Sequence, residues 1–377
     1  MSDFEQFIPA HIRALHAYSP GKPARQAARE SGLTDVLKLA SNENPFGPSP
    51  RALEAISRAA KEANFYPDND SSELRRALAE RHNLPEEQIL ITGGSTQLID
   101  ILCRTLLAPR LNAVTSERSF IVYPMLTRSA GGEIVQAPMT GDAYDLDAIA
   151  HAITPATRIV FLSNPNNPTG TMFDAGATDR FLDQLPNHLL VVLDEAYCDY
   201  ATAFAAQRGM EYSHSLDYVR QGRSLIVLRT FSKAHGLAGL RIGYGMGPAK
   251  LLVHFSHMRT AFSVSGIAEA AALAALDDEQ HIRRAVESNL GESKRLEQEL
   301  RSLGARVVQT SGNFIYFDCG EDAGALVKRI QAEGVIVRPM GPWGAPTAVR
   351  VTVGTPTQNR RFMAALKHAM ERAAARS

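Results

Sequence analysis

The chain has 377 residues, of which 45% are hydrophobic and 21% are charged, the balance of a folded globular protein. Its 40 basic and 40 acidic residues give a formal net charge of zero, which argues against a nucleic-acid-binding protein, because such proteins carry a basic excess or patch. Three widely spaced cysteines and the lack of an HExxH motif argue against a disulfide framework and a metal site. No run approaches the ~20 apolar residues of a membrane span, and residues 1–20 lack a signal-peptide pattern, so we expect a cytoplasmic protein.

A chain of this length is expected to form two domains, because single domains usually hold ~100–200 residues. We predict an N-terminal arm over residues 1–40, a large domain over 41–262 and a smaller α+β domain over 263–377.

The large domain is predicted to be of the α/β class. Asp70 and Glu73 form the pattern of a capping box before a helix. Strands are expected over 88–94, 188–197 and 224–233, a further strand that runs into a Pro/Asn turn over 158–170, and a helix over 95–107. The strand segments are continuous apolar runs without alternation, which is typical of strands buried on both faces of a mostly parallel sheet covered by helices.

The pattern changes near residue 265. A long helical stretch is expected to about Leu303, followed by strand-like segments at 305–319 and 334–340 on either side of a helical pattern at 322–333. A third strand is expected over 347–355. Thr355 and Pro356 then begin a final helix, because Pro has no N–H to lose at the first helical position.

Lys233 is the first candidate for catalysis. It follows the apolar run at 224–228, and a lysine at a strand end is usually only a solvated charge. Thr230 and Ser232 supply hydroxyls beside it, and Arg241 supplies a guanidinium, which together are the donors that bind a phosphate dianion. A lysine beside a phosphate site indicates an amine that condenses with the aldehyde of a phosphorylated cofactor.

A second phosphate feature lies where the strand at 88–94 meets the helix at 95–107. Gly94, Ser95 and Thr96 combine the free backbone N–H groups of a helix N-terminus with two hydroxyls. An ordinary glycine turn with a serine cap has the same sequence, so this segment alone leaves both interpretations open.

Polar side chains also follow two other predicted strands. Asp194 ends the run LLVVLD, and a buried carboxylate near a pyridine nitrogen would keep that nitrogen protonated; a satisfied core acid is the alternative. Tyr197 and Asn167 could donate a phenol and an amide hydrogen to the oxygen of the same ring. Asn and Pro favour turns regardless of function, so a rigid turn is the alternative for NPNNPTG.

Taken in chain order, these blocks resemble the fold-type-I aminotransferases, and the pattern spans almost the whole chain. The resemblance implies pyridoxal 5′-phosphate, held as a Schiff base on Lys233. It also implies a large domain with a mostly parallel sheet flanked by helices and a smaller α+β domain.

Several segments are similar to the histidinol-phosphate aminotransferase family, namely LASNENPFGPSP, FYPDNDSSELRRALA, LVVLDEAYCDY, LRTFSKAHGLAGLRIGYG, SGNFIYF and VRVTVGT. The resemblance implies that Tyr66 reaches across a dimer interface to the partner's cofactor phosphate. It implies that Phe120 stacks on the pyridine ring, where the family often has a tyrosine. The implied substrate contacts are Asn313 and Arg350, with Arg338 and Tyr18 holding a phosphate or carboxylate tail.

The activity implied by this resemblance is transfer of the amino group of L-histidinol phosphate to 2-oxoglutarate in histidine biosynthesis. Lys233 would be displaced by the incoming amine and then move a proton between the substrate and the cofactor. Arg350 could pair with a phosphate in one half-reaction and a carboxylate in the other. We expect a homodimer that acts on small molecules, without a metal, nucleic acid or membrane partner.

Three other functions stay open at this point. An aromatic amino-acid aminotransferase would share nearly every motif, and a decarboxylase of O-phosphothreonine would share the fold and the phosphate site. A catalytically silent scaffold or regulatory binding module is the third, although the intact lysine, aspartate and arginine argue against it. The sequence does not name the side chain that contacts the imidazole ring.

Overall fold

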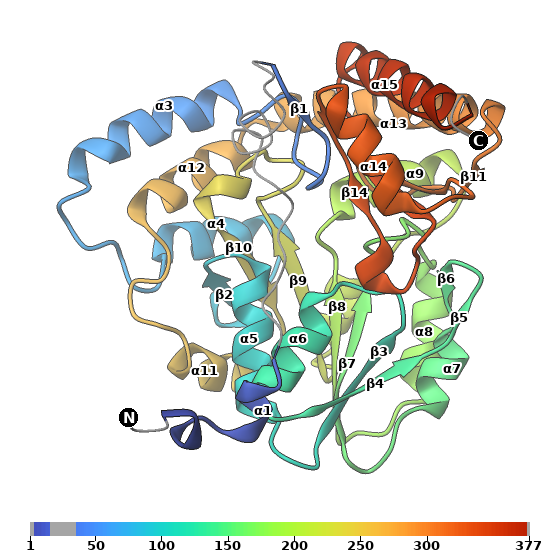
Figure 1. The fold of residues 1–377 in the computed structure, drawn as a ribbon. Helices are drawn as coiled ribbons and strands as arrows, with labels where there is room; N and C mark the ends of the chain where they lie inside the picture. Colours follow the sequence, from blue (N-terminus) through green and yellow to red (C-terminus); the bar gives the residue numbers. More distant parts are fainter. Residues whose placement is uncertain (1–3, 16–34, 375–377) are drawn as a thin grey trace.

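The computed structural model describes residues 4–15 and 35–374 (Figure 1). Its larger part is built on a seven-stranded sheet in the order β2-β10-β9-β8-β7-β3-β4. The strands are β2 (Ile89–Thr92), β3 (Asn112–Ser116), β4 (Glu133–Ala137), β7 (Thr157–Ser163), β8 (Leu190–Asp194), β9 (Leu225–Thr230) and β10 (Gly243–Met246). The strands from β9 to β4 are parallel, and β10 is antiparallel to both of its neighbours. The predicted α/β class with a mostly parallel sheet is confirmed.

The central strands are buried on both faces, which explains their unbroken apolar runs. Along β8, Leu190 and Val192 join the hydrophobic cluster on one face of the sheet. Val191 and Leu193 join the cluster on the other face. Successive side chains of a strand point to opposite faces, so a strand between two helical layers has no position for a polar side chain until it ends.

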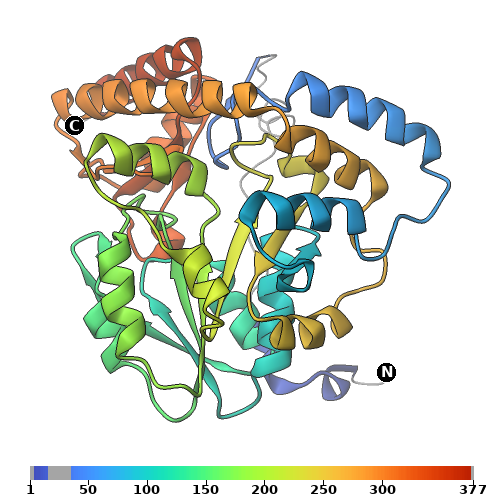
Figure 2. The ribbon, with the colours of Figure 1, turned by 180° about the vertical axis from the view of Figure 1, so that it is seen from behind.

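Helices cover both faces of this sheet (Figures 1 and 2). The helices α5 (Ser95–Leu106), α6 (Val122–Ser129) and α11 (Ala249–His257) contribute to one cluster. The helices α3 (Pro50–Ala59), α4 (Ser72–His82), α7 (Leu146–His151), α8 (Ala175–Asp183), α10 (Ser215–Arg220) and α12 (Gly266–Leu276) contribute to the other. The remaining elements of this part are η2 (Ala60–Glu62), η3 (Glu86–Gln88), η4 (Ala238–Leu240), α9 (Cys198–Gln207) and the hairpin of β5 (Met139–Thr140) and β6 (Ala143–Tyr144).

The smaller part has its own sheet and core. Its four strands follow the order β11-β12-β15-β14 and are antiparallel. They are β11 (Arg306–Val307), β12 (Phe314–Asp318), β14 (Arg338–Pro339) and β15 (Ala348–Thr352), packed with α13 (Glu279–Ser302), α14 (Ala323–Ala332) and α15 (Pro356–Ala374). The short strand β1 (Leu37–Lys38) pairs with β13 (Val335–Ile336), and η5 (Gly341–Trp343) follows β14. Figure 2 shows α13 crossing the top of the molecule from α12 into this part.

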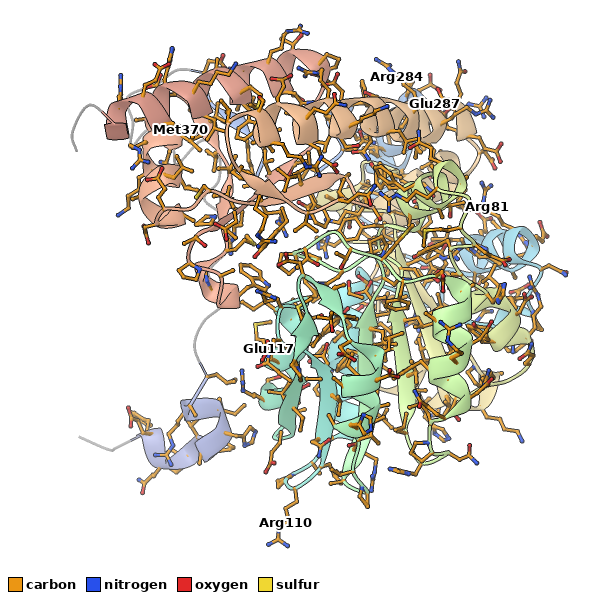
Figure 3. The ribbon with its side chains drawn as sticks, turned by 90° about the vertical axis from the view of Figure 1, so that its right-hand side faces the viewer. Arg81, Arg110, Glu117, Arg284, Glu287 and Met370 are labelled. Atoms are coloured by element: carbon orange, nitrogen blue, oxygen red, sulfur yellow. The ribbon has the colours of Figure 1, made fainter. Side chains whose placement is uncertain are left out.

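The first described residues form η1 (Phe4–Phe7) and α1 (Ala10–Arg13), and α1 contacts α6. Figure 3 shows this segment beside the larger part, with Met370 at the top of the molecule and Arg110 at the bottom. Within residues 4–15 and 35–374, no helix has the length and apolar character needed to cross a membrane.

Two local predictions were wrong. Asp70 does not cap α4, because its carboxylate pairs with Arg259 at 2.6 Å; Asp68 instead accepts the backbone N–H of Ser72 at 2.7 Å. The helical stretch after residue 265 is also two helices. The first ends at Leu276 with Asp277 as its C-cap, and Asp278 caps the second by accepting from the backbone N–H of His281.

The domain boundary after residue 262 stays a prediction, and packing favours a later position. The alanines of α12, such as Ala268 and Ala271, join the core of the larger sheet and pack against α3 and α4. Leu296 and Leu300 of α13 join the core of the smaller part. A boundary between α12 and α13 therefore divides the two cores.

Candidate active site

A cavity of about 250 Å³ lies at the carboxyl ends of β7, β8 and β9. Ligands of open α/β sheets bind at these strand ends, because the loops that follow the strands diverge there. Ten of the residues predicted from the sequence line the cavity, namely Ser95, Thr96, Phe120, Asn167, Asp194, Tyr197, Thr230, Ser232, Lys233 and Arg241. Ser41, Glu43, Ser163, Ala196 and Ala238 complete the lining.

The amine of Lys233 lies inside this cavity. Its Nζ donates to the backbone carbonyl of Ser41 at 3.4 Å and lies 5.3 Å from the centre of the Tyr197 ring. Tyr197 itself is 3% exposed. The lysine is therefore held against the buried wall of the cavity, as a lysine that acts on a bound molecule requires.

Asp194 is the last residue of β8 and is buried. Its carboxylate accepts hydrogen bonds from the Tyr123 hydroxyl at 2.8 Å and from the backbone N–H of Ala196 at 3.2 Å. Burial raises the pKa of Asp194 to about 6, against the opposing effect of these two hydrogen bonds. The charged form of a carboxylate with a raised pKa is strongly stabilised by a cation placed beside it, and a protonated pyridine is such a cation.

The opposite end of the lining suits an anion. The helix α5 begins at Ser95, directly after Gly94, which has a φ of +88°. A Cβ at Gly94 would lie 2.6 Å from Nη2 of Arg241, so only glycine lets the guanidinium come this close to the helix N-terminus. Arg241 also donates to Ser232 at 3.4 Å, and Thr230 donates to the same hydroxyl at 3.0 Å. The first-turn N–H groups of α5, the hydroxyls of Thr230 and Ser232 and the guanidinium of Arg241 therefore lie together at this end of the cavity, as donors to an anion.

Phe120 forms an aromatic wall of the cavity. Its ring meets Tyr123 edge-on at 5.5 Å, and Tyr123 stacks on Phe161 at 4.6 Å. Because Tyr123 also donates to Asp194, the aromatic wall and the buried acid belong to one connected set of contacts.

Two predicted residues of the smaller part lie next to the cavity without lining it. Arg350, on β15, is buried and donates to the side-chain oxygen of Asn167 and, at 3.0 Å, to the carbonyl of Ala40. Asn313 is buried and donates to the carbonyl of Asn42 at 3.0 Å. These two predicted substrate residues therefore contact the residues that line the cavity or immediately adjoin it.

The chain matches the model of the family "Aminotransferase class I and II" over residues 34–366. The protein belongs to this family. A histidinol-phosphate aminotransferase 2 from Pseudomonas aeruginosa is 44% identical over 368 residues, which cover 97% of this chain and 98% of that protein. A histidinol-phosphate aminotransferase from Akkermansia muciniphila is 41% identical over 369 residues, with 97% and 99% covered.

Solved structures agree with this family. The histidinol-phosphate aminotransferase from Sinorhizobium meliloti, in complex with pyridoxal-5′-phosphate, superposes with a TM-score of 0.88 at 28% identity and covers 97% of this chain and 98% of that chain. A mutant aspartate aminotransferase from Thermus thermophilus shares the fold with a TM-score of 0.81 at 23% identity, with 96% and 99% covered. The predictions of a fold-type-I architecture and of an aminotransferase are confirmed.

Six predicted residues are not among the described residues that line the cavity. Gly94, Asn313 and Arg350 adjoin it as described above, and the other three are Arg338, Tyr66 and Tyr18. Arg338 is the direct cross-strand neighbour of Arg350, and its guanidinium lies 5.5 Å from the centre of the Trp343 ring. Tyr66 is 82% exposed, and its ring centre lies 4.8 Å from that of Phe262, with the two rings tilted by 31°. Tyr18 lies outside the described residues.

Tyr123 and Asn42, like the five lining residues named above, were not predicted from the sequence. Tyr123 contacts Asp194 from 71 residues away in the chain, and Asn42 donates to the Tyr197 hydroxyl at 2.9 Å from 155 residues away. Asn42 lies in LASNENPFGPSP, a segment that supports the family resemblance without marking one side chain. Its neighbours Ser41 and Glu43 line the cavity.

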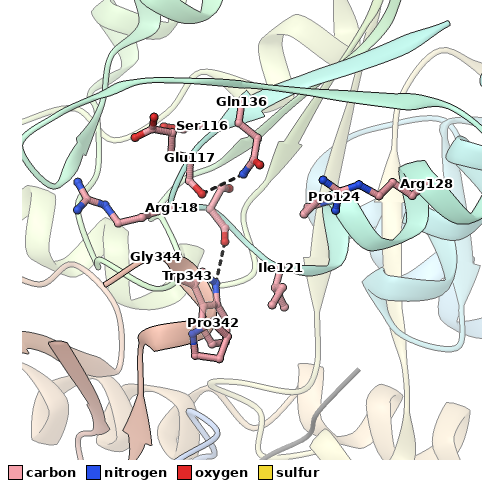
Figure 4. Close-up of a pocket in the computed structure, with 11 residues that line it drawn as sticks. Ser116, Glu117, Arg118, Ile121, Pro124, Arg128, Gln136, Pro342, Trp343 and Gly344 are labelled. Carbon is pink, nitrogen blue, oxygen red and sulfur yellow. Dashed lines mark hydrogen bonds between the residues drawn. The ribbon is translucent and has the colours of Figure 1, made fainter. Parts of the chain in front are cut away.

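A larger cavity of about 450 Å³ lies beside the site (Figure 4). Residues on both sides of Phe120 line it, including Ser119 and Ile121. The Trp343 indole N–H donates to the carbonyl of Ser119 at 3.0 Å, which ties η5 to the segment that carries Phe120. This cavity has no lysine and no buried carboxylate in its lining, so the chemistry of the side chains, rather than volume, marks the smaller cavity as the candidate active site.

Among the described residues, no group of three or more His, Cys, Asp or Glu side chains is placed to hold a metal ion.

Proposed function

We propose that this aminotransferase depends on pyridoxal 5′-phosphate and transfers the amino group of L-histidinol phosphate to 2-oxoglutarate. The observation that carries the proposal is one cavity in which an amine, Lys233, lies with a buried acid and an anion-binding helix N-terminus. The names of the relatives at 44% and 41% identity, which cover nearly the whole chain, support the choice of substrate.

The residues of the cavity fit this cofactor. Gly94, Ser95 and Arg241 would bind its phosphate, and Phe120 would lie against its ring. Asp194 would hold a proton on the pyridine nitrogen. The loss of solvation on burial raises the pKa of this acid, and an ion pair with the protonated nitrogen would offset that loss. When bound, the cofactor supplies an electron sink for bond changes at the substrate's Cα.

Lys233 would act both as the attachment point and as the base. Its amine is within the cavity, so once an incoming amine replaces it, it can carry a proton between the substrate's Cα and the cofactor. Asn167 accepts from Arg350 with its side-chain oxygen, which leaves its amide hydrogens for the cavity. Tyr197 can donate its phenol hydrogen to the same ring oxygen.

The two arginines of the smaller sheet would bind the anionic group of each substrate. Arg338 and Arg350 are direct neighbours on adjacent antiparallel strands, so their side chains leave the same face of the sheet and one anion beside that face would meet both. Histidinol phosphate carries a phosphate and no α-carboxylate, whereas glutamate carries carboxylates, and a guanidinium can form bidentate pairs with either group.

We also propose that the enzyme is a cytoplasmic homodimer. Phe65, Tyr66 and Phe262 expose 71%, 82% and 45% of their surface, and exposed aromatic residues in one region are typical of a protein interface. Tyr66 would then reach the cofactor phosphate of the partner subunit.

The proposal is tested by comparing three substrates with the purified enzyme. With 2-oxoglutarate as acceptor, we expect kcat/KM for histidinol phosphate to exceed that for phenylalanine by ~100-fold or more, because the phenylalanine ring offers no phosphate to the arginine pair. Glutamate formation is the measurement. Equal or faster turnover of phenylalanine would establish an aromatic aminotransferase, and release of CO₂ from O-phosphothreonine would establish the decarboxylase. A protein that binds the cofactor but turns over none of them would be the silent module.

A further inference from the structure

The segment 40–42 contacts three predicted site residues through consecutive backbone carbonyls. Ala40 accepts from Arg350 at 3.0 Å, and Ser41 accepts from Lys233 at 3.4 Å. Asn42 accepts from the side chain of Asn313 at 3.0 Å. One short stretch of backbone therefore contacts the guanidinium, the amine and the amide that the sequence marks for substrate and cofactor.

The side chain of Asn42 adds a fourth contact, to the phenol of Tyr197. Asn42 is 1% exposed, and its Nδ2 donates to the Tyr197 hydroxyl oxygen at 2.9 Å. A phenol has one hydrogen to donate. Because its oxygen already accepts from the amide, the hydrogen of Tyr197 is available to an acceptor in the cavity that Tyr197 lines.

We propose that Asn42 is a positioning residue, whose amide directs the phenol hydrogen of Tyr197 toward the ring oxygen of the bound cofactor. This inference rests on the proposed function. Asn42 does not line the cavity, so it would act on the cofactor only through Tyr197, and its effect must depend on that phenol.

The backbone explains why asparagine can stand at this position. Asn42 has a φ of +57°, in the left-handed region, which glycine, asparagine and aspartate adopt most readily. Its own N–H donates to the hydroxyl of Thr352 at 2.9 Å, and its carbonyl accepts from Asn313, so both sides of the residue are anchored to the smaller part of the molecule. The amide is therefore presented to Tyr197 from a fixed backbone.

Asn42→Gly is the matched test, because glycine keeps the left-handed backbone and the carbonyl while removing the amide. The measurement is the pH midpoint of the change in visible absorption of the cofactor-loaded protein. A hydrogen bond donated to the ring oxygen stabilises its anionic form, so weakening that bond raises the affinity of the chromophore for a proton. We expect the midpoint of Asn42→Gly to move to higher pH by about 0.5 to 1 unit, the effect of one hydrogen bond.

Tyr197→Phe decides whether the effect passes through the phenol. In the Tyr197→Phe background, adding Asn42→Gly is expected to move the midpoint no further. Asn42→Asp is expected to shift the midpoint more than Asn42→Gly, because a carboxylate accepts the phenol hydrogen and draws it out of the cavity. Thermal unfolding of each variant verifies that it folds before its midpoint is compared.

Three outcomes would overturn the inference. They are an unchanged midpoint in Asn42→Gly, an equal shift with and without the phenol, and a wild-type midpoint in Asn42→Asp, which would mean that the amide oxygen faces the phenol. Failure of the proposed function is a separate result, because the wild-type protein would then show no visible cofactor band or no amino transfer.

Discussion

The two walls of the active-site cavity are built in different ways. The wall from the larger part consists of residues at the ends of adjacent strands, and Asp194 is a register partner of Leu228 on β9, close before Lys233. The wall from the smaller part does not line the cavity itself but contacts its lining residues through side chains, as in the bond from Arg350 to Asn167. A strand ladder holds its residues wherever the sheet forms, whereas Arg350 is in place only when the two parts pack together. We therefore expect the first wall to determine cofactor chemistry and the second to determine substrate recognition.

Replacing Lys233 tests the first wall most severely. Lys233→Ala should lower kcat by ~10⁴-fold or more, because it removes both the covalent attachment and the base. Glutamate formation from histidinol phosphate is the measurement. Borohydride should fix the cofactor to the wild-type protein but not to the variant, and Lys250→Ala, at an exposed lysine on α11, is the control. Turnover by Lys233→Ala at the rate of the control would contradict the assignment.

Replacing Asp194 tests whether its buried charge lowers the stability of the cofactor-free protein while it favours a bound cation. The folded-state pKa of this acid is raised from 3.8 to about 6, so the charged carboxylate lowers the free energy of unfolding. This loss of stability is absent below pH 4, grows as the pH rises to 6 and is constant above pH 6. In the absence of cofactor at pH 7, Asp194→Asn should therefore increase the free energy of unfolding by up to about 3 kcal/mol. The variant should also bind the cofactor more weakly.

Urea unfolding of the cofactor-free proteins between pH 4 and pH 8 measures this effect. Asp147→Asn, at an exposed carboxylate, should leave the free energy of unfolding unchanged. If Asp194→Asn is less stable than the wild type at pH 7 without cofactor, burial of the charge is not the dominant effect at this position.

Replacing Arg350 tests the second wall alone. Lysine keeps the charge but cannot form the bidentate contact, so Arg350→Lys should lower kcat/KM ~10–100-fold for both histidinol phosphate and 2-oxoglutarate. The visible absorption of the bound cofactor should stay that of the wild type. Steady-state kinetics with each substrate provide the measurement, with Arg361→Lys as the control on α15. Unchanged rates with both substrates would remove Arg350 from substrate binding.

The smallest effect is expected at Tyr66, which belongs to neither wall of the cavity in its own chain. Tyr66→Phe should weaken cofactor binding by ~2–10-fold, the loss of one hydrogen bond, if its phenol reaches the partner's phosphate. Fluorescence titration of the cofactor-free protein measures the affinity, and sedimentation gives the oligomeric state. Lys250→Ala, at the exposed lysine on α11, is again the control. A monomeric protein with the same affinity in Tyr66→Phe would refute the shared site.

Much of the first wall was predictable, because local chemistry marks it. A run such as LLVVLD becomes a strand between two helical layers, and its first polar residue is expected where the strand ends. Asp194 and Lys233 could therefore be assigned to the sheet edge from the chain alone. The acceptor at the start of α4 could not, because both Asp68 and Asp70 precede the helix and the ion pair of Asp70 with the distant Arg259 is visible only in the structure.

The sequence by itself determined the fold class, the aminotransferase family and the residues at the strand ends, since each follows from apolar runs and motifs within a few residues. Only the tertiary structure decided which side chains meet across the cavity. Asn42 approaches Tyr197, and Arg350 approaches Asn167, because the smaller part packs against the sheet edge. The physical reason is that hydrogen bonds between residues more than 150 positions apart depend on how two cores pack, which no local pattern records.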